Sequence, residues 1–503
     1  MLSLFLSLSL TNTLLVLTII LLMKVIFELF AKDQTKTSKK EDGLLEPPMP
    51  RKWPIIGHLH LMGGYEVPYQ AFSAIGRKYG DLVNIQLGNV KCVVVNGQKN
   101  IREALVTKGH HFDSRPNFQR YHMLFSGNKE NSLAFCDWSD TQKTRRDMLK
   151  IHTFPRAFTN KFYSLEQLMA TEMQSMMSQV KSNHVTDLKP IILRHCANIF
   201  LNHFCSKNFN ANDRKFVEMV DNFDDIFYEV NQGHAADFLP FLMPLHKKNL
   251  ERIQLICQNI RQFFDNEVIE NRYEDFDIES EPNDYVESLI CSVKSGASPD
   301  LSWDSAMFAL EDIIGGHSAV GNFLVKVFAY LVKEPEVQKK MQEEIDRVVG
   351  GNRSVSLTDK NAMPYTEAVI FEAIRLIASP IVPRVANQDS SIDDYRIEKG
   401  TVLFLNNYDL SMSEKLWDEP KKFMPERFIR DNRLIKPDYF LPFGGGRRSC
   451  MGYRMVQLVS FGILGEFLQN FTVCPVENES YKVPVGSLAL KKDTFKFRFV
   501  RRQ

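Results

Sequence analysis

The most constraining feature of this chain is a glycine-rich segment near its C-terminal end, PFGGGRRSCMG at residues 442–452. The segment satisfies the pattern F-x-x-G-x-R-x-C-x-G through Phe443, Gly446, Arg448, Cys450 and Gly452. Five fixed positions tested at some 500 starting points match by chance with a frequency of about 10⁻⁴. Because glycine permits the left-handed backbone of a tight turn, the pattern predicts a turn that presents one cysteine at a fixed place.

A cysteine presented in this way suits the thiolate ligation of a haem iron. Backbone N–H groups of the turn can hydrogen-bond to the sulfur and tune its electron donation, and a thiolate ligand favours O–O bond cleavage. Arg448 can pair with a haem propionate, and Gly452 allows the following helix to lie close to the porphyrin. We therefore predict Cys450 as the axial iron ligand; the alternative is a glycine-rich turn with a bystander cysteine.

The other cysteines do not suggest a competing metal site. The chain has eight cysteines, widely scattered and without a C-x-x-C pair, which argues against a zinc site or a disulfide scaffold. Reduced thiols in a protein that faces the cytosol are the simplest interpretation.

The cysteine segment resembles the haem-binding loop of the cytochromes P450, and the resemblance extends along nearly the whole chain. It implies haem b as the cofactor, with NADPH acting indirectly through NADPH–cytochrome P450 reductase. It also implies that Glu372 and Arg375 of FEAIRL, with Arg427 of FMPERF, form a buried network that braces the haem loop. Residues 344–347 (EIDR) satisfy E-x-x-R as well, but only Glu372 has the expected position before the loop.

Two motifs depart from the pattern of this family. The first lies at residues 138–146 (WSDTQKTRR), where the family has a tryptophan–arginine pair that contacts a propionate. We predict Arg145 as the propionate partner, since it can share a helical face with Trp138; the alternative is a solvated basic pair. The resemblance also implies that Arg384 contacts the cofactor.

The second departure is GGHSAV at residues 315–320, where the family has an acid–alcohol pair that relays protons during oxygen activation. The acid is replaced by Ser318 and the threonine by Ala319, whereas the glycines that let the helix open beside the haem remain. His317 and Ser318 are the candidates for a substitute proton relay; the alternatives are water held by the opened helix and simple core packing.

This variant resembles the Spook/Spookier type of insect P450, a group assigned to early ecdysteroid synthesis between 7-dehydrocholesterol and ketodiol. The resemblance implies a sterol, or another apolar small molecule, as the substrate of a monooxygenase. Two alternatives stay open: a rearranging P450 that needs no reductase, and a haem-binding sensor or carrier without turnover. The missing acid–alcohol pair favours these two, and the intact cysteine motif favours the monooxygenase.

The N-terminus predicts a membrane anchor. Residues 2–23 contain no charged side chain and would reach about 33 Å as a helix, enough to cross a bilayer core. The alternative, a cleaved signal peptide, lacks a basic n-region and a small-residue cleavage site. Lysines follow the run, which favours a single-pass protein of the endoplasmic reticulum membrane with its catalytic domain in the cytoplasm. We predict a linker at 24–46, a proline-rich hinge at 47–58 and the catalytic domain at 59–503.

The remaining chain predicts a mainly α protein with a minor β portion, the cytochrome P450 fold. Apolar and polar residues alternate over 81–97, which predicts a β-hairpin. Residues 301–333 could form one helix of about 50 Å. Residues 273–284 predict an exposed acidic loop. A formal charge of +1 offers no field for nucleic acid. Basic candidates for docking the acidic reductase are Arg145, Arg146, Lys150, Lys421, Lys422 and Arg447.

Overall fold

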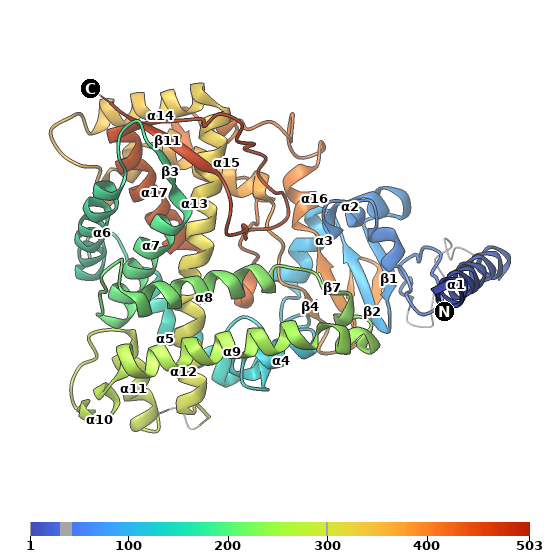
Figure 1. Ribbon diagram of the computed structural model, residues 1–503. Coiled ribbons are helices and arrows are strands. Elements are labelled where there is room, and N and C mark those ends of the chain that lie inside the picture. Colours follow the sequence, from blue (N-terminus) through green and yellow to red (C-terminus); the bar gives the residue numbers. More distant parts are fainter. Residues whose placement is uncertain (1, 31–42, 298–299, 503) are drawn as a thin grey trace.

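The computed structural model describes residues 2–30, 43–297 and 300–502. Helices make up most of the molecule, and the largest sheet lies to one side of the helical body (Figure 1). The predicted class, a mainly α protein with a minor β portion, is confirmed.

The helices begin and end where local chemistry favours it. Ser139, Thr159 and Ser302 each accept a hydrogen bond from a backbone N–H in the first turn of the following helix, which satisfies a donor that the helix leaves free. The α-helices are α1 (Leu2–Phe30), α2 (Pro68–Tyr79), α3 (Gln98–Arg102), α4 (Gln119–Leu124), α5 (Asp140–Thr153), α6 (Asn160–Gln179), α7 (Leu188–Cys205), α8 (Arg214–Val230), α9 (Lys247–Phe263), α10 (Arg272–Asp275), α11 (Tyr285–Lys294), α12 (Trp303–Ile314), α13 (Gly316–Lys333), α14 (Pro335–Val348), α15 (Pro364–Ile377), α16 (Asn407–Met412) and α17 (Tyr453–Asn470).

The central helix is interrupted rather than continuous. The single helix expected over 301–333 is divided into α12 and α13 at Gly315. After this break, Ser318 N–H donates to the Gly315 carbonyl three residues back, 3.1 Å away, so the turn is tighter than an α-helical one. Almost every side chain of α13 is buried, and α13 runs through the middle of the helical body (Figure 1).

In the described part of the chain, four small sheets accompany the helices. The predicted hairpin is confirmed: β1 and β2 are antiparallel, with Leu82 opposite Val95. β7 pairs parallel with β2, and β4 completes that sheet. The strands are β1 (Leu82–Leu87), β2 (Val90–Val95), β3 (Val185–Asp187), β4 (Arg384–Val385), β5 (Ser390–Ile392), β6 (Tyr395–Ile397), β7 (Val402–Leu405), β8 (Ile429–Arg430), β9 (Arg433–Leu434), β10 (Phe471–Cys474) and β11 (Lys496–Arg501).

The N-terminal segments agree only in part with the expectation. No helix in the described part of the chain is both long and apolar enough to cross a membrane. Of the predicted linker, residues 31–42 lie outside the described residues. The proline-rich segment is extended over residues 47–53 and turns at residues 54–56. It packs along β1: Asn84 Nδ2 donates to the Pro47 carbonyl at 3.1 Å, and Asn84 N–H donates to the Pro48 carbonyl at 2.9 Å.

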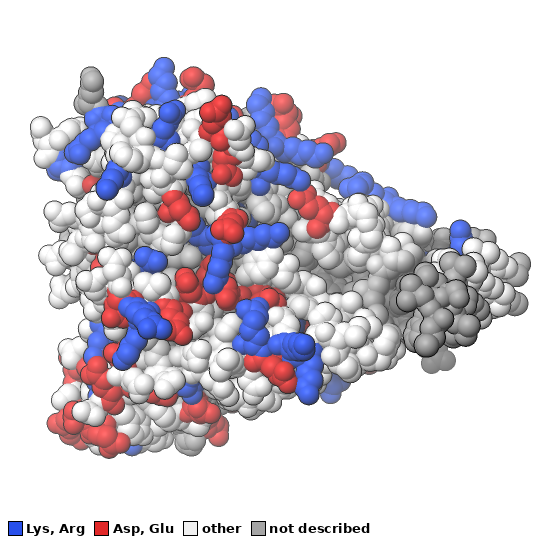
Figure 2. All heavy atoms as spheres, viewed as in Figure 1, with Lys and Arg blue, Asp and Glu red and all other residues white. Residues whose placement is uncertain are grey.

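The acidic segment at 273–284 is largely exposed, as predicted, and acidic side chains gather near α10 in Figure 2. Its last residue is an exception. Asp284 is buried, accepts from the Glu287 N–H at the start of α11 and pairs with Arg272 at 2.8 Å. Over much of the face in Figure 2 positive and negative side chains are interleaved.

Candidate active site

The cysteine segment forms a folded loop that ends at the start of α17. Gly444 and Gly446 adopt positive φ angles of 70° and 66°, and a Cβ on Gly446 would lie 2.1 Å from the Leu105 carbonyl oxygen. Only glycine fits that position without rearrangement. The Cys450 N–H donates to the Phe443 carbonyl at 3.0 Å, which closes the loop.

The Cys450 thiol borders space enclosed by protein. Cys450 is exposed, yet burial raises the pKa of its thiol; both statements hold when a side chain faces an internal hollow. The Gly452 N–H, the charge of Arg146 and the Tyr453 N–H act in the opposite direction on that pKa. These N–H groups are the donors that a thiolate ligand needs. A Cβ on Gly452 would lie 4.0 Å from the sulfur, so this glycine lies close to the thiol.

Four buried arginines converge beside this loop. Arg448 donates from Nη2 to the Cys136 carbonyl at 2.7 Å, and Arg146 donates from Nη2 to the Ser449 carbonyl at 2.6 Å. Arg384 approaches the Arg448 carbonyl at 3.4 Å. Arg115 donates from Nε to the Ala134 carbonyl at 2.7 Å.

Among the described residues, negative charge compensates these arginines only in part. Burial and repulsion from Arg448 lower the pKa of Arg384 to about 9 and that of Arg146 to about 10. Asp113 opposes the shift at Arg384, but it is already paired with Arg447. Two buried nitrogens of Arg384, Nε and Nη1, have no hydrogen-bond partner among the described residues. Because buried charges need partners, the cluster fits an anionic group with more than one charge.

A haem satisfies both requirements of this site. Its iron would take the Cys450 thiolate, and its two propionates would neutralise the buried arginines. Of the predicted cofactor-binding residues, the structure brings together Cys450, Arg448, Arg384, Phe443, Gly446 and Gly452. When bound, the haem supplies the activation of molecular oxygen.

Arg145 is not part of this cluster. Its Nη1 donates to the Asn131 carbonyl at 2.7 Å and its Nη2 to the Glu130 carbonyl at 3.0 Å, on the side of α5 that faces Ser305 of α12. Arg146 and Arg115, which the sequence does not single out as cofactor contacts, are further candidates for that role. For Arg146 the signal is the pair of adjacent arginines in TQKTRR; Trp138, whose helical face predicts Arg145, lies before α5 begins.

Glu372, Arg375 and Arg427 meet in one buried network. Arg375 donates to both carboxylate oxygens of Glu372 at 2.7 Å, and Arg427 Nε donates to Glu372 Oε1 at 3.1 Å. Glu372 and Arg375 are fully buried. Arg375 Nη1 also binds the Ser411 and Pro420 carbonyls at 2.7 Å. The network therefore holds the segment that leads into the cysteine loop, and loss of one member would cost roughly 3–5 kcal/mol.

His317 and Ser318 lie on the buried side of the interrupted helix, with no exposed surface. His317 Nδ1 hydrogen-bonds to the Ile314 carbonyl at 2.7 Å, and its ring meets the Phe223 ring edge-on at 5.4 Å. Burial lowers the pKa of His317 to about 4, so the imidazole is neutral near pH 7. The position that replaces the family's threonine, Ala319, is partly exposed instead.

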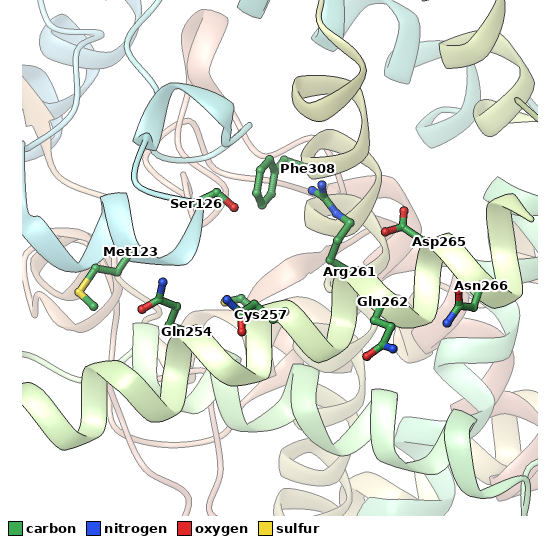
Figure 3. Close-up of a pocket in the computed structure, with 10 residues that line it drawn as sticks. Met123, Ser126, Gln254, Cys257, Arg261, Gln262, Asp265, Asn266 and Phe308 are labelled. Atoms are coloured by element: carbon green, nitrogen blue, oxygen red, sulfur yellow. The ribbon is translucent and has the colours of Figure 1, made fainter.

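A separate surface hollow of about 260 Å³ opens between α4, α9 and α12 (Figure 3). Arg261 at this hollow pairs with Glu311 and, at 2.8 Å, with Asp304. Its lining includes Gln254, Gln258, Gln262, Asp265 and Asn266. None of the residues that line it belongs to the cysteine loop, so we do not place the substrate there.

Comparison with known proteins agrees with this site. The family model "Cytochrome P450" matches residues 47–499. Cytochrome P450 307a1 of Drosophila melanogaster is 38% identical over 479 residues, covering 90% of this chain and 88% of the relative. Steroid 17-alpha-hydroxylase/17,20 lyase of Ictalurus punctatus is 29% identical, with 85% of each chain covered, and human cytochrome P450 1A1 is 28% identical, with 89% and 91% covered. The chain therefore belongs to the cytochrome P450 family and is a haem-thiolate monooxygenase that receives electrons from NADPH through a reductase.

Proposed function

We propose that this monooxygenase oxidises a sterol at an early step of ecdysteroid synthesis, between 7-dehydrocholesterol and ketodiol. The observation that carries the proposal is GGHSAV at residues 315–320, which resembles the Spook/Spookier type. The 38% identity to the Drosophila protein supports it. A second relative has a name that states a steroid substrate.

The helix beside the proposed substrate suits a flat apolar molecule. Positions 312, 315, 316 and 319 are partly exposed, whereas residues 313, 314, 317, 318 and 320 are buried. The exposed positions recur at helical spacing and form one stripe. Three of the four are glycine or alanine, and the rings of Phe223 and Phe200 lie beside Gly315 and Gly316, so the surface along most of the stripe is apolar.

The test is incubation of the purified, haem-loaded protein with 7-dehydrocholesterol, with and without reductase and NADPH, followed by mass spectrometry. We expect an oxidised sterol that forms only when both reductase and NADPH are present. No product from any sterol in the complete system would reject the proposal.

A second candidate activity, beside reductase-dependent oxygenation, is the rearrangement of a peroxide that itself supplies the oxygen. The replacement of threonine by Ala319 favours it, because the usual relay alcohol is absent from the stripe. A product that forms from a sterol hydroperoxide without reductase, and does not form with reductase and NADPH, would select this candidate.

We also propose that residues 2–23 anchor the protein in the endoplasmic reticulum membrane, with the catalytic domain in the cytoplasm. The uncharged sequence supports this; side chains are described only for residues 12–26 of α1. Phe241 and Leu245 are 63% and 79% exposed and offer a second apolar contact with lipid. Deletion of residues 1–32 should release a haem-binding protein from membranes at high salt. If all of the shortened protein stayed on the membranes, residues 2–23 would not be the sole anchor.

A further inference from the structure

Asp312 is the acidic residue on the partly exposed stripe of α12 and α13. Its stripe neighbours Gly315, Gly316 and Ala319 carry no polar side-chain group. One turn before Asp312 the stripe ends, because Phe308 is 4% exposed and packs edge-on against Phe125 at 5.5 Å. The carboxyl group therefore lies at one end of an otherwise apolar surface, about 10 Å along the helix from Ala319.

One oxygen of the Asp312 carboxyl group, Oδ2, accepts two hydrogen bonds. The Ser132 hydroxyl donates to Oδ2 at 3.0 Å and the Leu133 N–H donates to the same atom at 2.7 Å. The Ala134 N–H also acts on this carboxyl group, but among the described residues the hydrogen bonds of normal distance and angle, from Ser132 and Leu133, both go to Oδ2. The carboxyl group is thus fixed by the loop before α5 and keeps one oxygen for another donor.

Asp312, like Cys450, borders space that protein encloses. The residue is partly exposed, yet burial raises the pKa of its carboxyl group to about 6, against the hydrogen bonds from Leu133 and Ser132 and the charge of Arg145. A group facing bulk water would not be desolvated in this way. The free oxygen consequently faces an internal hollow, in which a bound molecule would find it.

We infer that Asp312 binds a hydroxyl group at one end of the substrate, while the apolar body of that substrate lies along Gly315, Gly316 and Ala319. An ionised carboxylate only accepts hydrogen bonds, so the group it selects is a donor such as a hydroxyl and not a ketone. A hydrogen bond to a charged acceptor in a desolvated site is among the stronger ones. The inference rests on the proposed sterol substrate and adds which end of the sterol is recognised.

The test uses three sterols that differ only at carbon 3: cholesterol, its ketone cholest-5-en-3-one, and cholest-5-ene, which lacks the oxygen. Binding to the haem-loaded protein is measured by the change in the haem absorption spectrum and, independently, by quenching of tryptophan fluorescence. We expect cholesterol to bind about tenfold or more tightly than either analogue. In Asp312→Ala this preference should vanish, with the dissociation constant of cholest-5-ene unchanged.

Two further variants separate binding from folding. Ser132→Ala removes one hydrogen bond that holds the loop but leaves Oδ1 in place, so it should keep the preference for the hydroxyl. Asp312→Asn keeps the shape of the side chain without its charge, and should retain a reduced preference for cholesterol over the two analogues. This inference alone would be overturned if the unaltered protein bound all three sterols equally tightly. It would also be overturned if Asp312→Ala weakened the binding of all three sterols equally. If no sterol binds, the proposed sterol function fails and this inference with it.

Discussion

Arg146 of α5 donates a hydrogen bond of 2.6 Å to the carbonyl oxygen of Ser449, the residue that precedes Cys450. Burial raises the pKa of the Cys450 thiol, and the charge of the same guanidinium opposes that rise. One side chain thus ties α5 to the cysteine loop and favours the thiolate form. Arg145, its neighbour in sequence, binds the carbonyls of Glu130 and Asn131 on a different side of the same helix.

The two arginines should therefore differ when each is replaced. Arg146→Ala should reduce the haem content of the purified protein, because it removes positive charge from the cofactor cluster, and change its thermal unfolding less. Arg145→Ala leaves two carbonyl groups without a donor and should cost about 1–3 kcal/mol of stability. Haem absorbance relative to protein, with thermal unfolding of the apoprotein, measures both effects. If Arg145→Ala instead reduced the haem content and Arg146→Ala mainly reduced the stability, Arg145 would be the cofactor contact.

Cys450→Ala should abolish the absorption band that marks thiolate ligation in the reduced carbon monoxide complex. The loop has no second sulfur ligand, since Met451 is a thioether that does not ionise. Cys474→Ala, a partly exposed cysteine on β10, is the matched control and should keep the band. Persistence of the thiolate band in Cys450→Ala would refute the assignment of the iron ligand.

The sequence was most informative where chemistry depends on short spacing. The cysteine loop and the β1–β2 hairpin each lie within about 20 residues, so local pattern was sufficient to predict them. The choice between Arg145 and Arg146 required the start of α5, which a Ser139 cap places after Trp138. Helix boundaries are the least certain part of a prediction from sequence.

Long-range packing was not accessible from local pattern. Asp284 belongs to a charged run that predicts a solvated loop, yet its partner Arg272 and its place at the start of α11 bury it. Asp312 attracts no attention in the sequence, because its role depends on Ser132 and Leu133, 180 and 179 residues away. Such residues become visible only when the fold brings their partners together.

Lys326 of α13 predicts a pH-dependent stability. Its ammonium donates to the Ser487 carbonyl and is buried near Lys189, which pairs with Asp224 at 2.7 Å. Burial and the charge of Lys189 lower the pKa of Lys326 to about 7, whereas an unfolded lysine titrates near 10.4. Between these values the unfolded chain binds a proton that the folded protein does not, so the stability contributed here rises with pH.

Lys326→Met should remove that dependence. Relative to the variant, the unaltered protein should gain stability as the pH rises from about 7 to about 10, in urea unfolding of the two holoproteins. Lys333→Met, at the C-terminal end of the same helix, is the control and should show no such trend. A stability difference that stays constant across this range would mean that Lys326 is charged in the folded protein.

Reductase docking should depend on exposed lysines and not on the α5 arginines. Arg145 and Arg146 are buried and cannot contact a partner, whereas Lys421 and Lys422 are exposed. Lys421→Glu with Lys422→Glu should slow the first electron transfer in stopped-flow measurements, and the effect should shrink as salt screens the charges. Lys215→Glu on α8 is the control. An unchanged rate would exclude these two lysines from the docking surface.

The last prediction concerns the replaced acid–alcohol pair, whose two positions differ in the structure. Ala319 lies on the partly exposed stripe, so Ala319→Thr adds a hydroxyl there without repacking the core. Ser318 is fully buried, and its carbonyl accepts from Asn322 Nδ2, which also binds Asp224. Ser318→Asp would bury a carboxylate near Asp224 and should cost several kcal/mol of stability. Thermal unfolding therefore separates the two variants before any activity is measured.

Because the enzyme is a reductase-dependent monooxygenase, Ala319→Thr should keep or raise the NADPH-coupled yield of oxidised sterol measured by mass spectrometry. Loss of product in a stable Ala319→Thr protein that still consumes NADPH would show that the alanine itself is required, and would favour the rearranging alternative.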